Sequence, residues 1–164
     1  MSLASTHRLW SSAGPKSYEV AKARIQLLFL SSHYPCSKLT RHWSLDNPEG
    51  LCSYNICKEN SIVESPEHLL LNCPAYTSTR ENLIYCCTKL KNPVSHSLAI
   101  SFLLSSSKPK MMQFLLDCST MPEVIVKSQL HGDEVYSDLF YLSRTWCFAI
   151  HRERMKRLHR WNFR

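Results

Sequence analysis

The sequence is poor in glycine, with only 3 among 164 residues. Glycine-rich loops that cradle phosphate need several glycines at fixed spacing, so a nucleotide-binding loop of that kind is excluded. The chain also lacks an Asn-x-Ser/Thr acceptor for N-glycosylation. No apolar run approaches the ~18 residues that cross a bilayer, so we expect no contact with a membrane.

Cysteine, in contrast, is abundant, with 8 residues. An even number could form a disulfide framework, but the first ten residues (MSLASTHRLW) contain no apolar stretch typical of a secretory signal. We therefore expect an intracellular protein, of the nucleus or the cytoplasm, whose thiols stay reduced. Cysteines that accompany histidine in such a chain favour metal binding first and redox chemistry second.

The net charge of +7 is concentrated at one end of the chain. Residues 144–164 contain seven arginines and lysines and a single acid, Glu153. A basic segment beside a nearly neutral body favours a polyanionic partner, and we expect it to contact nucleic-acid phosphates. The alternative is that these charges only solubilise a helix end. The expected contact residues are Arg152, Arg154, Lys156, Arg157, Arg160, Trp161 and Arg164.

Helix signals recur along the chain, and the alternation typical of strands is absent. The motif Ser65-Pro66-Glu67 combines a hydroxyl cap, a proline at the first helical position and an acid in the first turn. The motifs Ser78-x-x-Glu81 and Thr120-x-x-Glu123 have the spacing of capping boxes. With apolar periodicity, they predict helices over residues 18–31, 66–73, 78–90, 98–104, 110–117, 120–132 and from 133 onward.

Two of these helices have a defined apolar face. On the first, the face consists of Val20, Ala23, Leu27 and Leu30, and on the last it consists of Leu139, Leu142, Trp146 and Ile150. We expect a mainly α fold: a small helical domain over residues 17–150 with an inserted, loop-rich Cys/His zinc-binding segment at 50–74. A flexible arm (1–16) precedes this domain, and a basic extension (151–164) follows it.

The segment 50–74 contains two pairs of potential metal ligands with equal spacing. Four residues separate Cys52 from Cys57, and four separate His68 from Cys73. Tetrahedral zinc takes four ligands of these types, often two from a turn and two from a helix. The spacing predicts one structural Zn²⁺ bound by these four side chains. The alternative is that the cysteines are buried thiols and that His68 is a polar residue at a helix start.

Other residues near this segment bear on the zinc prediction. Either Glu64 or Glu67 could orient the imidazole from outside the ligand set. His33 and Cys36 form a less favoured, competing ligand pair. A catalytic zinc would need an open coordination position, which four protein ligands do not leave. We therefore expect the ion to be structural.

The same segment resembles a known protein family. Leu51-Cys52-x4-Cys57, followed by Glu67-His68-Leu69-Leu70-Leu71-Asn72-Cys73-Pro74, looks like the zinc-binding region at the C-terminal end of the reverse-transcriptase polyprotein of LINE-type (non-LTR) retrotransposons. The resemblance extends to flanking stretches such as Lys38-Leu39-x-Arg41-His42-Trp43 and Leu142-x-Arg144-Thr145-Trp146-Cys147. It covers most of the chain, from about residue 8 to residue 164.

The resemblance implies the same four ligands and a role in holding template RNA or target DNA. Polymerase chemistry needs paired carboxylates that hold metal ions, and this chain has four aspartates, none adjacent to another. We therefore expect a non-enzymatic, zinc-stabilised nucleic-acid-binding module without polymerase or endonuclease domains. Its expected partners are RNA or DNA and the polymerase domain of a full-length element. The alternative is a structural or protein-interaction helical domain with a basic tail, including a decayed element fragment.

Overall fold

The structure, a computed structural model, describes residues 13–41 and 45–161, without the side chains of 159–161. The described chain is mostly helical, and its only β-structure is an isolated antiparallel bridge between Leu51 and Val63. The mainly α fold is thus confirmed. The α-helices are α2 (Ser17–Leu30), α3 (Ser37–Thr40), α4 (Asn55–Glu59), α5 (Thr77–Cys87), α6 (Pro93–Leu103), α7 (Lys108–Asp117), α8 (Pro122–His131) and α9 (Glu134–Trp161).

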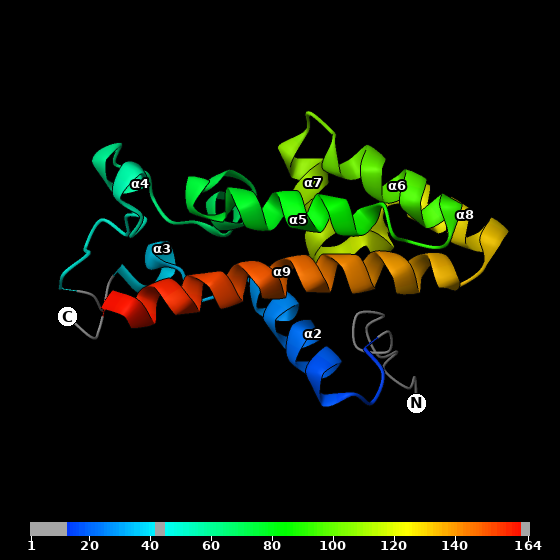
Figure 1. Ribbon diagram of the computed structural model, residues 1–164, viewed down its shortest axis with the longest axis horizontal. Helices are drawn as coiled ribbons and strands as arrows, with labels where there is room; N and C mark the ends of the chain where they lie inside the picture. Colours follow the sequence, from blue (N-terminus) through cyan, green and yellow to red (C-terminus); the bar gives the residue numbers. More distant parts are fainter. Residues whose placement is uncertain (1–12, 42–44, 162–164) are drawn as a thin grey trace, which may run out of the picture.

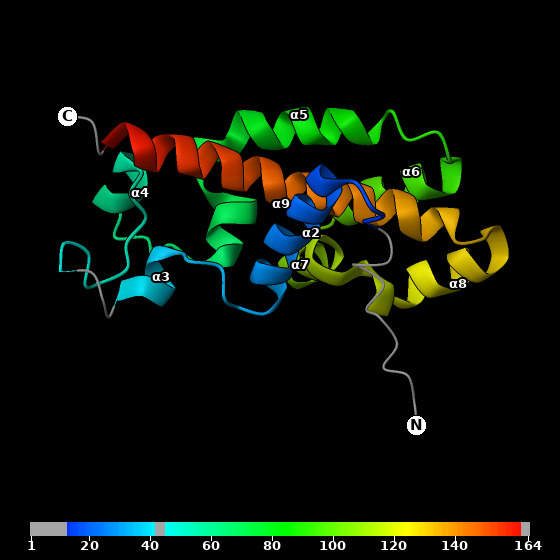
Figure 2. The same cartoon turned by 90° about the horizontal axis from the view of Figure 1, so that it is seen from below.

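Helix α9 runs along the whole molecule and organises the other elements. Figure 1 shows α5, α6, α7 and α8 on one side of α9, while α2 crosses it on the other side. The view from below in Figure 2 places α3 and α4 near the C-terminal end of α9. No helix in the described part of the chain combines the length and apolarity that a bilayer span requires.

The apolar face expected on α9 is confirmed. Leu139, Leu142, Trp146 and Ile150 are all buried in the main hydrophobic core. The helix continues without interruption past His151 to Trp161. The expected boundary between the helical domain and the basic extension, at 150/151, therefore lies inside one helix and marks only a change in composition. Residues 1–12 of the expected arm lie outside the described residues.

The face predicted for α2 is wrong, because polar residues take two of its four buried positions. Of the predicted residues only Ala23 is buried, and it shares the interface with Lys22, Gln26 and Phe29. Gln26 donates to the carbonyl oxygen of Leu115 at 2.8 Å and to the hydroxyl of Ser143 at 3.0 Å. A hydropathy pattern scores such a glutamine as a surface residue, although the nitrogen of its amide group has acceptors in the interior.

The helix starts at Ser78 and Thr120 are also wrong. A 3-10 turn, Pro74–Tyr76, runs directly into α5 at Thr77, so that helix has no separate start for Ser78 to cap. Helix α8 begins at Pro122, which takes the first helical position after Met121. The expected end of α8 at Gly132 is confirmed. Helix α6 begins five residues earlier than expected, because the side chain of Asn92 accepts from the backbone of Val94 and caps it.

Candidate metal centre

The four predicted ligands converge in the buried interior of the segment 50–74. Cys52, Cys57, His68 and Cys73 are all buried, and their ligand atoms lie within 4.8 Å of one another. The Sγ atom of Cys73 lies 3.8 Å from that of Cys52 and 3.9 Å from that of Cys57. Two sulfurs bound to one tetrahedral zinc at about 2.3 Å lie about 3.8 Å apart. These spacings therefore fit a tetrahedral metal ion.

The first pair of ligands is held by a closed loop. The backbone N–H of Cys52 donates to the carbonyl oxygen of Ile62 at 2.8 Å, next to the bridge between Leu51 and Val63. Cys57 lies in the short helix α4, and its carbonyl oxygen accepts from the backbone of Ile62 at 2.9 Å. Ile62 thus ties both cysteines to one strand-like segment, which fixes their separation.

The second pair is brought together by a π-helical turn. Ser65 caps the helical segment, since its hydroxyl accepts from the backbone N–H of His68 at 3.1 Å. The turn His68–Asn72 is π-helical, and the N–H of Cys73 donates to the carbonyl oxygen of His68 at 2.7 Å. In an α-helix residues four apart share a face, whereas the wider π turn aligns residues five apart. This explains how a four-residue gap places both side chains on the same side.

The chemistry of the cluster fits a divalent cation. The buried Nε2 of His68 has no hydrogen-bond partner among the described residues. The contact between the sulfurs of Cys52 and Cys73, in which either atom can be the donor, lowers the pKa of Cys52 and raises the pKa of Cys73 far above its usual range. Burial raises the pKa of Cys57. Three buried sulfurs can all ionise only with a positive charge among them, and a metal ion would supply it.

Neither Glu64 nor Glu67 forms the expected contact that would orient the imidazole of His68. Glu67 is exposed, and its carboxylate accepts from Asn72 at 3.5 Å. The buried carboxylate of Glu64 accepts instead from the backbone and hydroxyl of Ser37, at 2.8 and 3.1 Å, and from Arg154 at 2.7 Å. Glu64 therefore joins the metal segment to α3 and α9.

Further contacts fasten the segment 50–74 to the helical body. The indole N–H of Trp146 donates to the carbonyl oxygen of Leu70 at 3.3 Å. Arg80 donates to the carbonyl oxygen of Cys73 at 2.6 Å. His33 and Cys36 are not part of the cluster: His33 is exposed and bonds to the carbonyl oxygen of Ser31, and the competing ligand pair is not formed.

The expected basic surface is only partly formed. Arg152, Lys156 and Arg157 are exposed on α9, as predicted. The prediction that Arg154 contacts nucleic acid is wrong. Its side chain is buried and pairs with Glu64, so it faces the interior. Its partner lies 90 positions earlier in the sequence, where a local charge pattern cannot reveal it. The side chains of Arg160 and Trp161, and all of Arg164, lie outside the described residues.

Gly50, two residues before Cys52, allows its backbone to approach the backbone of α3 closely. Its φ of +67° is one that residues with a side chain rarely adopt, and an added Cβ would lie 2.9 Å from the carbonyl oxygen of Ser37. We expect Gly50→Ala to cost about 1–2 kcal/mol from φ alone, plus the cost of moving α3. Gly14→Ala is the matched control, with a φ of +64° and open space around it. Urea unfolding should show the larger loss for Gly50→Ala, and equal losses would contradict the close approach.

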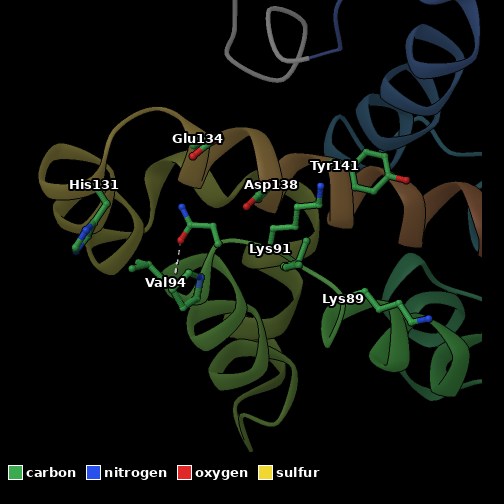
Figure 3. A pocket seen from close by; sticks show the side chains of 10 residues that line it. Lys89, Lys91, Val94, His131, Glu134, Asp138 and Tyr141 are labelled. Carbon is green, nitrogen blue, oxygen red and sulfur yellow. Dashed lines mark hydrogen bonds between the residues drawn. The ribbon is translucent and has the colours of Figure 1, made fainter.

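Two recesses lie at opposite ends of α9. The larger, of about 640 Å³, lies between the loop before α6 and the corner joining α8 to α9 (Figure 3). Lys89 and Lys91 line it together with Glu134 and Asp138, so its charges are of both signs. Within the described residues, no group of three or more Cys, His, Asp or Glu side chains other than the four ligands could hold a metal ion. The smaller recess lies beside the metal segment.

Comparison with models of known protein families, with curated proteins and with solved structures finds no match. The buried cluster of four ligands and the exposed side chains of Arg152, Lys156 and Arg157 are the features of the described residues that bear on function.

Proposed function

We propose that this protein is a zinc-stabilised nucleic-acid-binding module, without catalytic activity of its own. The observation that carries the proposal is the convergence of three sulfurs and one imidazole in a buried site with tetrahedral spacings. Its resemblance to the C-terminal region of a non-LTR reverse transcriptase agrees with this proposal. In a full-length element the partners would be RNA or DNA and the polymerase domain.

Zinc is the ion that best matches the donor set. Thiolate and imidazole ligands in tetrahedral geometry are typical of structural zinc, whereas calcium and magnesium take oxygen ligands. The four protein side chains fill the coordination sphere, which leaves no position for a reacting water. The role that fits the arrangement is therefore to hold the segment 50–74 in shape against α9.

One of the exposed basic side chains, Arg157, lies directly beside this segment. Arg157 donates to the carbonyl oxygen of Ala75 at 2.9 Å, two residues after the last ligand. Arg152 and Lys156 are one helical turn apart on α9, and Lys156 also pairs with Glu153. Arg152, Lys156 and Arg157 thus give the C-terminal part of α9 an exposed basic surface, which Arg157 connects to the turn after the last ligand. Phosphate backbones bind such surfaces by releasing counterions.

The double variant Arg152→Gln/Lys156→Gln should weaken binding to duplex DNA and to single-stranded RNA alike, because phosphate contacts carry little sequence information. Each lost contact should lower the slope of log K against log salt by about 0.7–0.9. Fluorescence anisotropy at several salt concentrations measures both quantities. The double variant Lys89→Gln/Lys91→Gln removes the same charge at the larger recess and should change binding far less. No salt-dependent binding to any nucleic acid would contradict the proposed function.

A further inference from the structure

The smaller recess lies between the metal segment and α9. It has a volume of about 230 Å³ and is formed by three separate parts of the chain. The loop and helix α4 between the first two ligands supply one wall, the turn after Cys73 supplies another, and α9 closes it. Its lining residues are Ser53, Tyr54, Asn55, Tyr76 and Arg157.

Arg157 is held in place by aromatic and backbone contacts. Its guanidinium carbon lies 5.7 Å from the ring centroid of Tyr54 and 5.8 Å from that of Tyr76. A hydrogen bond to the carbonyl oxygen of Ala75 at 2.9 Å gives the guanidinium a third contact. The side chain nevertheless remains exposed. A fixed, exposed guanidinium is a pre-organised donor for phosphate, because little conformational entropy is lost on binding.

The two tyrosines differ in what they offer a ligand. Tyr76 is buried, with 4% of its surface exposed, and forms the floor of the recess. Tyr54 is half-buried, so part of its ring remains accessible. It lies between Cys52 and Cys57, and the metal site therefore positions it. The side chains of Ser53 and Asn55 are exposed on either side of it and can hydrogen-bond to the edge of a base.

We propose that this recess binds one unstacked nucleotide of a single-stranded nucleic acid, with its base against Tyr54 and its phosphate at Arg157. The inference rests on the proposed function. It adds that the preferred ligand is single-stranded, and it names the residues that select a single strand over a duplex. Bases stack on tyrosine rings without regard to their sequence, and arginine adds a cation–π contribution. The base pairs of a duplex stay within their own stack, so a recess of this kind is filled from a single strand.

The test compares the zinc-loaded full chain with Tyr54→Ala, using a labelled 12-nucleotide single-stranded RNA and a duplex of the same length. Stacking of one base is worth about 1–3 kcal/mol, so we expect the RNA affinity to fall about 5–150-fold, while duplex affinity stays within about twofold. Tyr54→Phe keeps the ring and should bind as the parent protein does. Arg157→Lys keeps the charge but loses the planar guanidinium, and should also weaken RNA binding more than duplex binding.

Photocross-linking gives a second, positional measurement. RNA that contains 5-iodouridine should cross-link to the peptide that carries Tyr54, and Tyr54→Ala should remove that cross-link. Unchanged RNA affinity in Tyr54→Ala that still binds stoichiometric zinc would overturn the inference, and so would cross-links confined to other peptides. Equal loss on RNA and duplex would also overturn it. If the parent protein binds neither nucleic acid, the proposed function itself fails.

Discussion

Replacing Cys57 with serine should remove stoichiometric metal and release the segment 50–74 from the fold. Structural zinc contributes about 10–16 kcal/mol in zinc-finger peptides, which is comparable to the whole stability of a small domain, about 5–15 kcal/mol. Leu69 and Leu70 of the metal segment belong to the hydrophobic core, but the helices packed around α9 supply most of its residues. We therefore expect local unfolding of the metal segment to precede loss of the remaining helices.

Hydrogen exchange locates this effect. The amides of Cys52, Ile62 and Glu64 are protected by bonds within the segment, and they should exchange at rates near those of an unfolded chain in Cys57→Ser. Amides in α7 and in the first half of α9 should keep most of their protection. Cys86→Ser is the matched control, because Cys86 is exposed and lies outside the cluster. Retained protection in Cys57→Ser, or equal loss in Cys86→Ser, would contradict this account of the segment.

The second large effect is expected from Glu64→Ala. This change leaves the guanidinium of Arg154 buried without its carboxylate and removes the acceptor for the backbone of Ser37. Breaking a buried ion pair from one side costs about 3–5 kcal/mol. The free energy of unfolding in urea should fall by about that amount, while the zinc content stays near one ion per chain.

An exposed pair on the same helix serves as the control for Glu64→Ala. Glu153 and Lys156 also form an ion pair of 2.7 Å, but at the surface, where such pairs contribute at most about 1 kcal/mol. Glu153→Ala should therefore change the unfolding free energy little. The double variant Glu64→Leu/Arg154→Met removes both buried charges and should recover much of the lost stability. If Glu64→Ala costs no more than Glu153→Ala, the pair does not join the metal segment to α9.

The ligand set could be predicted from the sequence because its signals are local. The spacing of the cysteines and His68, with the cap at Ser65, lies within about twenty residues. The apolar stripe of α9 was predictable for the same reason, since one helix face repeats every three to four residues. The π turn was not predictable, because it differs from an α-helix only in which carbonyl oxygen the N–H of Cys73 selects.

The wrong predictions for Arg154 and for the face of α2 involve partners that are distant in sequence. Arg154 belongs to a basic run, yet a single carboxylate 90 residues away draws it into the interior. Lys22 and Gln26 are polar, but α7 and α9 supply partners that allow their burial. The recess at Tyr54 was also missed, because its walls come from three parts of the chain. Long-range contacts of this kind leave no periodic signal in one sequence.

The most direct test of the central claim is the metal content of the full chain, purified without chelator from zinc-supplemented cells. Inductively coupled plasma mass spectrometry should give one zinc per chain, and replacement by Co²⁺ should give the visible absorption of a tetrahedral, thiolate-ligated ion. Cys86→Ser should keep this stoichiometry, and Cys57→Ser should lose it. Well-folded protein with no stoichiometric metal, or with zinc that Cys57→Ser retains, would contradict the four-ligand zinc centre.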